Sequence, residues 1–278
     1  MKKIILILVL ILSCNLVATA QAEKIKGDRN VTIKQTLIDD FETIIVDADF
    51  SIEIVYNNKA AVEIETDSNL HDIIQFEVVE GVLTFSKLTR ITSKKKLRIT
   101  VSYSDTLKHI ETKDDGEIRS LTSMNLGDVN LISEDNSRVY LNINAKNFNF
   151  KSSGKSKTRL NITADSSKVE LSDNSKLEGS ITSKVADFDL YQRSNATLNG
   201  NAETSIIRLD NTTNFDGEKF NVKTADASVE FNSDLTLSVS ESIVIAASGD
   251  SEIYLYGSPK ITISKFEDTA KLQKKVHK

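Results

Sequence analysis

The chain repeats one apolar–polar–apolar triplet: Val129-Asn130-Leu131, Phe148-Asn149-Phe150, Val169-Glu170-Leu171, Phe188-Asp189-Leu190 and Ile207-Arg208-Leu209. Their first residues are 19, 21, 19 and 19 positions apart, and segments rich in Ser, Asn, Asp and Gly separate them. A repeat near 20 residues with period-2 alternation inside each unit is typical of a coiled β-solenoid. We therefore predict an all-β fold, a single-stranded parallel β-helix with coils of ~20 residues.

The apolar positions of the triplets predict the core of this solenoid. We expect Val129, Phe148, Val169, Phe188 and Ile207 to stack inward from successive coils. A second series of apolar residues is expected to point inward beside them: Val139, Leu141, Ile143, Leu160, Ile162, Leu177, Ile181, Leu198, Val229, Phe231, Ile253 and Leu255. Polar residues that accept tight or left-handed turns lie between the strands, among them Asn136, Asn174 and Gly249. Between Phe215 and Val239 the sequence pattern does not define a coil register.

The N-terminal part also alternates as strands do, for example in 50–54, 62–65 and 97–101. We expect these strands to continue into the stack. One or two helical turns are predicted around Ser68 to Ile74, capped by Asp67 or Ser68.

The first residues have the pattern of an export signal. Lys2 and Lys3 precede an apolar run from Ile4 to Leu12, and Ala18-Thr19-Ala20 is a small-x-small cleavage site. The predicted organisation is a signal peptide (1–20), an N-terminal leader segment (21–36), one solenoid domain (37–265) and a polar tail (266–278). We expect the mature chain to begin at Gln21 and to contain no transmembrane segment.

Cys14 is the one cysteine of the chain and lies in this predicted signal. Ile11-Leu12-Ser13-Cys14 partly matches a lipobox, so Cys14 as an acylated lipoprotein anchor is the alternative to ordinary cleavage. The formal net charge is −5, and the densest basic groups are Lys94-Lys95-Lys96 and the lysines after 270. We therefore expect no nucleic-acid partner.

Several segments are similar to one known family. They are Phe50-Ser51-Ile52-Glu53-Ile54, Gly81-Val82-Leu83-Thr84-Phe85 and the closing run Ser248-Gly249-Asp250-Ser251-Glu252-Ile253-Tyr254-Leu255-Tyr256-Gly257-Ser258-Pro259. Over about residues 37 to 265 the chain resembles the putative auto-transporter adhesin, head GIN domain family. The resemblance implies an exported solenoid of a Gram-negative envelope, whether periplasmic, surface-bound or secreted, with no known catalytic residue.

The chain departs from the family at its turns. Where the family repeats Gly-Ser-Gly, this sequence has 115–117, 134–137 and 172–175, which are rich in Asp and Asn. Because Asn and Asp tolerate the left-handed conformation, we expect the departure to change turn detail and to leave the fold intact.

Two groups of residues are candidate sites. If the triplets stack in register, Asn130, Asn149, Glu170, Asp189 and Arg208 form an outward column. Glu170 and Asp189 could then hold calcium or act as an acid/base pair on a sugar, although a solvated face is the favoured interpretation. Tyr254 and Tyr256 are expected to point outward, where they could stack on sugars or simply pack across strands.

Other polar and titratable residues do not match the pattern of a known site. The three histidines, His71, His109 and His277, have no metal-ligand spacing, and Asp210 to Glu218 lacks the spacing of a calcium loop. We predict no catalytic, cofactor-binding or metal-binding residues and no cofactor. The expected function is a non-enzymatic envelope or surface binding protein of adhesion type, with a glycan or an envelope protein as its partner. A purely structural envelope protein and a carbohydrate-active β-helix enzyme are the alternatives.

Overall fold

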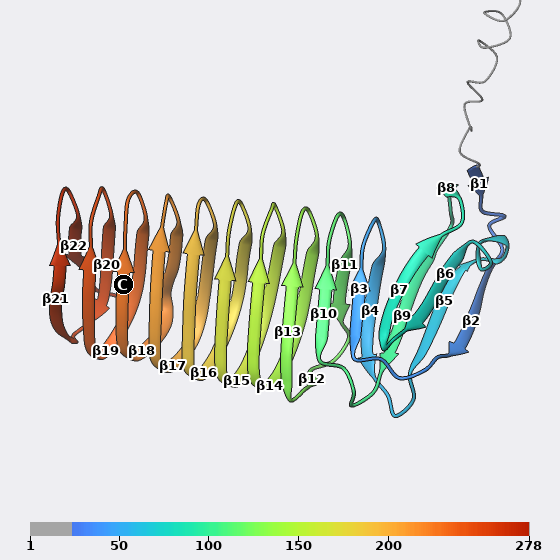
Figure 1. Cartoon of the computed structure of the whole chain (residues 1–278), viewed down its shortest axis with the longest axis horizontal. Helices are drawn as coiled ribbons and strands as arrows, with labels where there is room; N and C mark the ends of the chain where they lie inside the picture. Colours follow the sequence, from blue (N-terminus) through green and yellow to red (C-terminus); the bar gives the residue numbers. More distant parts are fainter. Residues whose placement is uncertain (1–23, 278) are drawn as a thin grey trace, which may run out of the picture.

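A computed structural model of the chain describes residues 24–277. It consists of a solenoid with a small cap at one end (Figure 1). The predicted signal peptide and Cys14 lie outside the described residues. The β-solenoid predicted from the repeat is confirmed.

Each coil contains two strand segments, which belong to two facing parallel sheets. The front sheet contains β3 (Thr43–Val46), β10 (His109–Thr112), β13 (Asp128–Ser133), the C-terminal halves of β14 to β19, and β21 (Lys260–Phe266). The back sheet contains β4 (Ser51–Tyr56), β11 (Glu117–Ser120), β12 (Met124–Asn125), the N-terminal halves of β14 to β19, β20 (Glu252–Gly257) and β22 (Lys271–Lys274).

Long strands run through both sheets in the middle of the solenoid. They are β14 (Arg138–Ser152), β15 (Lys157–Leu171), β16 (Lys176–Tyr191), β17 (Asn195–Asp210), β18 (Asn214–Val229) and β19 (Asp234–Ala247). From β14 to β17 each residue pairs with the residue 19 positions later. Parallel pairing satisfies the backbone donors and acceptors of each coil through its neighbours.

The cap consists of strands outside the coils. Its strands are β1 (Lys24–Lys26), β2 (Val31–Leu37), β5 (Ala61–Asp67), β6 (Ile74–Val79), β7 (Val82–Lys87), β8 (Arg90–Ser93) and β9 (Leu97–Tyr103). The pairs β2–β5, β5–β9 and β6–β7 are antiparallel, whereas β7 and β9 add in parallel to β3 and β4.

The N-terminal strands therefore enter the stack through β3 and β4 and then leave it to close its end. Leu83 of β7 lies opposite Ile44, and Ile99 of β9 lies opposite Ile52. All four side chains are buried. The short helical segment expected near Ser68 is a single 3₁₀ turn, Ser68–Leu70, without a side-chain cap bond from Asp67.

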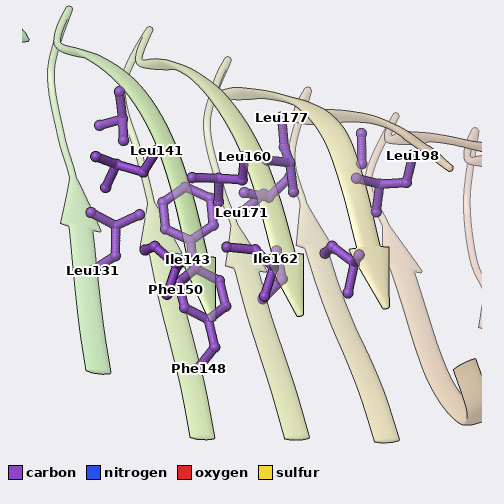
Figure 2. Packing of buried hydrophobic residues seen from close by; sticks show 14 of the residues in the cluster. Leu131, Leu141, Ile143, Phe148, Phe150, Leu160, Ile162, Leu171, Leu177 and Leu198 are labelled. Atoms are coloured by element: carbon purple, nitrogen blue, oxygen red, sulfur yellow. The ribbon is translucent and has the colours of Figure 1, made fainter. Parts of the chain in front are cut away.

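The core fills the space between the two sheets with apolar side chains from both (Figure 2). All five predicted triplet residues are buried, but they form two neighbouring columns instead of one. In the first column, Ser167 is the register partner that comes after Val129 and Phe148. In the second column, Val169, Phe188 and Ile207 come after Phe150. The 21-residue spacing is a two-residue slip on a 19-residue coil, and alternation keeps residues two apart on the same face.

Phe231 departs from the prediction. The alternation predicts an inward side chain, but the Phe231 side chain is 60% exposed and its φ is +56°. It lies at the turn where each coil passes from the front sheet to the back sheet. Within 215–239, where the sequence pattern defines no register, the pairing of β18 with β19 shifts between Gly217 and Asn221 and between Val222 and Thr224.

A left-handed residue occurs at every one of these front-to-back turns. The positions with positive φ are Ala48, Asp114, Asp135, Gly154, Asp173, Gln192, Asn211, Thr212, Phe231, Gly249 and Asp268. The prediction had the right residue types, but Asp135 and Asp173 take this conformation instead of Asn136 and Asn174. Asp and Asn thus replace glycine here, as the sequence suggested.

The turn side chains also connect successive coils. Asp173 Oδ2 accepts a hydrogen bond from the backbone N–H of Gly154 at 2.9 Å, and Gln192 Oε1 accepts one from Asp173 at 2.7 Å. Small hydroxyl residues form a buried column after these turns: Ser137, Ser156, Ser175, Ser194, Thr213, Ser233 and Ser251. Ser175 and Ser194 donate to the carbonyls of Ser172 and Tyr191, at 2.7 and 2.9 Å.

The Phe188 site provides a test of the core. Its ring packs against Phe215 and Phe220, with centroid distances of 5.0 and 5.6 Å. Phe188→Ala should lower the free energy of unfolding by about 3–5 kcal/mol, because it leaves a cavity between these rings. Phe231→Ala removes the same atoms from an exposed turn and should change it by less than about 0.5 kcal/mol. Equilibrium urea unfolding measures both, and equal losses would contradict the assigned core.

Candidate functional site

The acidic residues predicted on the front sheet do lie side by side. Glu170 is opposite Asp189, and Asp189 is opposite Arg208. Asn130 and Asn149 belong to the neighbouring outward column, in which Lys168 follows Asn149. The prediction of a single outward column is therefore wrong. The two-residue slip that divides the core residues into two columns divides the outward residues in the same way.

Each of these carboxylates has a cationic partner. Arg208 Nη1 lies 2.8 Å from Asp189 Oδ1, and Lys151 Nζ lies 3.2 Å from Glu170 Oε2. The hydrogen bond with Asp189 raises the pKa of Arg208. Burial, and then the charges of Asp189 and Glu170, raise the pKa of the Tyr191 phenol. The column Lys151–Glu170–Asp189–Arg208 is thus a balanced ladder of ion pairs.

The histidines lie apart from one another in the fold. His71 Nε2 is 2.9 Å from Thr32 Oγ1 in the cap, and His109 Nε2 is 3.8 Å from a Glu111 carboxylate oxygen. His277 stacks on Tyr256 with a centroid distance of 4.6 Å. Across residues 24–277, no three His, Cys, Asp or Glu side chains are placed to hold one metal ion.

Residues of the C-terminal segment cover the two candidate tyrosines. The Lys275 ammonium lies 4.5 Å from the ring centroid of Tyr254, whose hydroxyl donates to Glu252. His277 lies against the ring of Tyr256. A sugar could stack on these rings only after the segment moved away.

The back sheet has a groove that the sequence reasoning did not identify. It has a volume of about 510 Å³ and crosses β15 to β18. These four strands lie in the middle of the solenoid (Figure 1). The lining residues of the groove are Arg159, Asn161, Glu178, Gly179, Thr197, Leu198, Asn199, Asp216, Glu218 and Lys219. A neighbouring hollow of about 280 Å³ shares Arg159 and Glu178 and adds Tyr140, Lys157, Thr158 and Lys176.

Two local breaks in the repeat accompany the groove. Gly179 takes an inward position between Leu160 and Leu198 with φ +154°, where an added Cβ would lie 1.8 Å from the Leu160 carbonyl oxygen. The β17–β18 pairing then shifts between Thr197 and Asn199. Such irregularities re-aim side chains and are common beside functional sites.

One outward column supplies several polar residues of the groove and of the neighbouring hollow. Tyr140, Arg159, Glu178, Thr197 and Asp216 are register partners on five successive coils. Arg159 Nη2 lies 3.0 Å from Glu178 Oε2. The Asn161 amide donates to Asn142 Oδ1 at 2.6 Å in the column beside them.

The groove thus offers both hydrogen-bond donors and acceptors to a ligand. The predicted polar segment 210–218 contributes to it, although it does not form a loop around an ion. Asn211 and Thr212 form the left-handed turn, and β18 carries Asp216 and Glu218 into the groove. The signals available in the sequence were the glycine at an inward position, Gly179, and the interrupted alternation at 216–219. Alternation alone does not identify which outward columns are hollow.

One family model matches the chain, over residues 40–183 and 157–259. It describes a putative auto-transporter adhesin, head GIN domain. No curated protein sequence matches the chain. Between residues 24 and 277, no helix is long and apolar enough to pass through a bilayer.

Three solved structures share the fold. A crystal structure of a putative adhesin from Parabacteroides merdae has 17% identity and a TM-score of 0.61, covering 91% of this chain and 99% of that chain. A putative adhesin from Parabacteroides distasonis has 18% identity and a TM-score of 0.60, with 91% and 100% covered. A putative lipid binding protein from the same species has 16% identity and a TM-score of 0.62, with 91% and 99% covered.

Proposed function

The chain belongs to the putative auto-transporter adhesin, head GIN domain family, and on this premise we propose that it is a non-enzymatic, exported binding protein. The family points to binding, and the groove on the back sheet is the surface best suited to it. The proposed ligand is an extended glycan that lies across the coils. The observation that carries the proposal is the column from Tyr140 to Asp216, which runs through both hollows.

The dimensions and chemistry of this column fit such a ligand. Five stacked coils at about 4.8 Å per step give a row of roughly 19 Å. The row presents a phenol ring, a guanidinium, two carboxylates and a hydroxyl, from Tyr140, Arg159, Glu178, Asp216 and Thr197. Carboxylates and amides can hydrogen-bond sugar hydroxyls. The Arg119 guanidinium lies 4.6 Å from the ring centroid of Tyr140 and covers one ring face, so a sugar would meet the other face or the phenol hydroxyl.

Two other functions compete with this one. A purely structural envelope protein would bind no glycan in the groove. A carbohydrate-active enzyme would need one free acid and one free base on either side of a bound sugar. The Glu178 carboxylate is already paired with Arg159, and Glu218 lies 3.7 Å from the His277 ring. This leaves Asp216 as the one groove carboxylate without such a partner among the described residues, which favours binding over hydrolysis. Release of shortened sugars would favour the enzyme.

The proposal also places the protein in the envelope of a Gram-negative bacterium, as a periplasmic, surface-bound or secreted protein. This compartment requires the signal predicted from Lys2, Lys3 and the apolar run 4–12. Envelope proteins are the alternative partners, and a glycan screen separates them from sugars.

The glycan proposal predicts a site-specific loss of binding. On a glycan array, the mature protein should bind an extended oligosaccharide, and Thr197→Arg should abolish that binding by filling the groove. Thr204→Arg is the matched control, because Thr204 is exposed on the front sheet of the same strand, β17. Equal behaviour of the two variants, or binding to no glycan, would contradict the assignment of the groove.

Export predicts a defined N-terminus. Mass spectrometry of protein from the native envelope should give a mature chain that begins at Gln21, because Ala18-Thr19-Ala20 fits signal peptidase cleavage. An acylated N-terminus at Cys14 would show instead that the protein is a lipoprotein anchored through that residue. A chain that retains Met1 would contradict export.

A further inference from the structure

The two ends of the solenoid differ. At the N-terminal end, β7 and β9 of the cap cover the first coil. At the opposite end, β21 pairs with β19 and β22 pairs with β20, and no further described strand pairs with either (Figure 1). The last coil therefore presents an open strand edge.

At this edge, the last apolar side chains of the front-sheet core columns are exposed to solvent. Ile261, Ile263 and Phe266 are 42%, 52% and 41% exposed. Their partners one coil earlier, Ile243, Ile245 and Ala247, are at most 1% exposed. An open edge with apolar side chains is a template for another strand.

The same coil is basic in an acidic chain. Residues 260–277 contain five lysines and two carboxylates, whereas the whole chain has a net charge of −5. The lysines are Lys260, Lys265, Lys271, Lys274 and Lys275. Lys271 is paired with Glu252 at 2.8 Å, and Lys265 has an exposed pair with Glu267 at 3.4 Å that a partner carboxylate would have to share or replace. This charge attracts an acidic partner and opposes the direct apposition of two such ends.

We propose that the open end formed by β21 and β22 binds an acidic, extended segment of a partner protein by strand addition. The backbone of the segment would pair with β21. Its apolar side chains would cover Ile261 and Ile263, and its carboxylates would face Lys260 and Lys265. Insertion into a lipid bilayer fits less well, because the free backbone groups of an edge strand would lose their water there without a partner.

Fluorescence anisotropy with a short labelled peptide of alternating Glu and Val tests this proposal. We expect saturable binding, whereas a Glu–Ser peptide and a Lys–Val peptide should not bind. The double variant Lys260→Glu, Lys265→Glu should weaken binding about tenfold or more, through charge alone. Ile263→Glu should do the same, and Val244→Glu, on the outward face of the preceding coil, should have no effect.

Several results would overturn the proposal. They are no saturable binding of the Glu–Val peptide, equal binding of the Glu–Ser peptide, and equal weakening by Val244→Glu. Flotation with phosphatidylglycerol vesicles that Ile263→Glu abolishes would assign the end to membranes. Sedimentation of the protein alone as a dimer that the same variant dissociates would assign it to a second copy. The proposed glycan groove lies on other coils. If the glycan proposal is wrong, the peptide-binding test of the open end therefore keeps its meaning.

Discussion

The structure depends on backbone pairing between coils of matched length. Parallel strands can stack as a solenoid only if each coil returns to the same place, and from β14 to β17 it does so after 19 residues. The left-handed residue at each front-to-back turn makes this return possible. Buried hydroxyls such as those of Ser175 and Ser194 satisfy the carbonyls inside the turn. The apolar columns follow from the register that these elements establish.

Much of this fold was predictable because period-2 alternation and a repeat of about 20 residues have few structural solutions. The burial of Val129 and Phe188 and the turn chemistry followed directly. The two-residue slip did not, because residues two apart on a strand share a face and the sequence pattern is the same in either register. Phe231 was misplaced because an apolar residue at a left-handed turn resembles a strand residue. The cap was not predicted because alternation does not distinguish antiparallel from parallel partners.

The candidate site was less predictable than the fold. The outward residues Glu170, Asp189 and Arg208 were correctly placed together, yet in the structure Asp189 is paired with Arg208, and Glu170 is paired with Lys151. The groove instead forms where the repeat is broken, at Gly179 and at the register shift beside Thr197. In a regular solenoid, a side chain gains a special environment where a coil departs from its neighbours. Coil-to-coil departures, such as a glycine at an inward position, are therefore the places to search for binding surfaces.

The most direct test of coil matching is equilibrium unfolding, followed by circular dichroism, of a variant that lacks one whole coil. Deletion of residues 138–156 joins Ser137 to Lys157. It removes 19 residues, which is one complete coil, because Arg138 and Lys157 are register partners. This variant should keep its β spectrum and unfold cooperatively, because every remaining strand finds an equivalent neighbour. Deletion of 138–147 removes about half a coil and should abolish the cooperative transition. Equal disruption by both deletions would contradict the account.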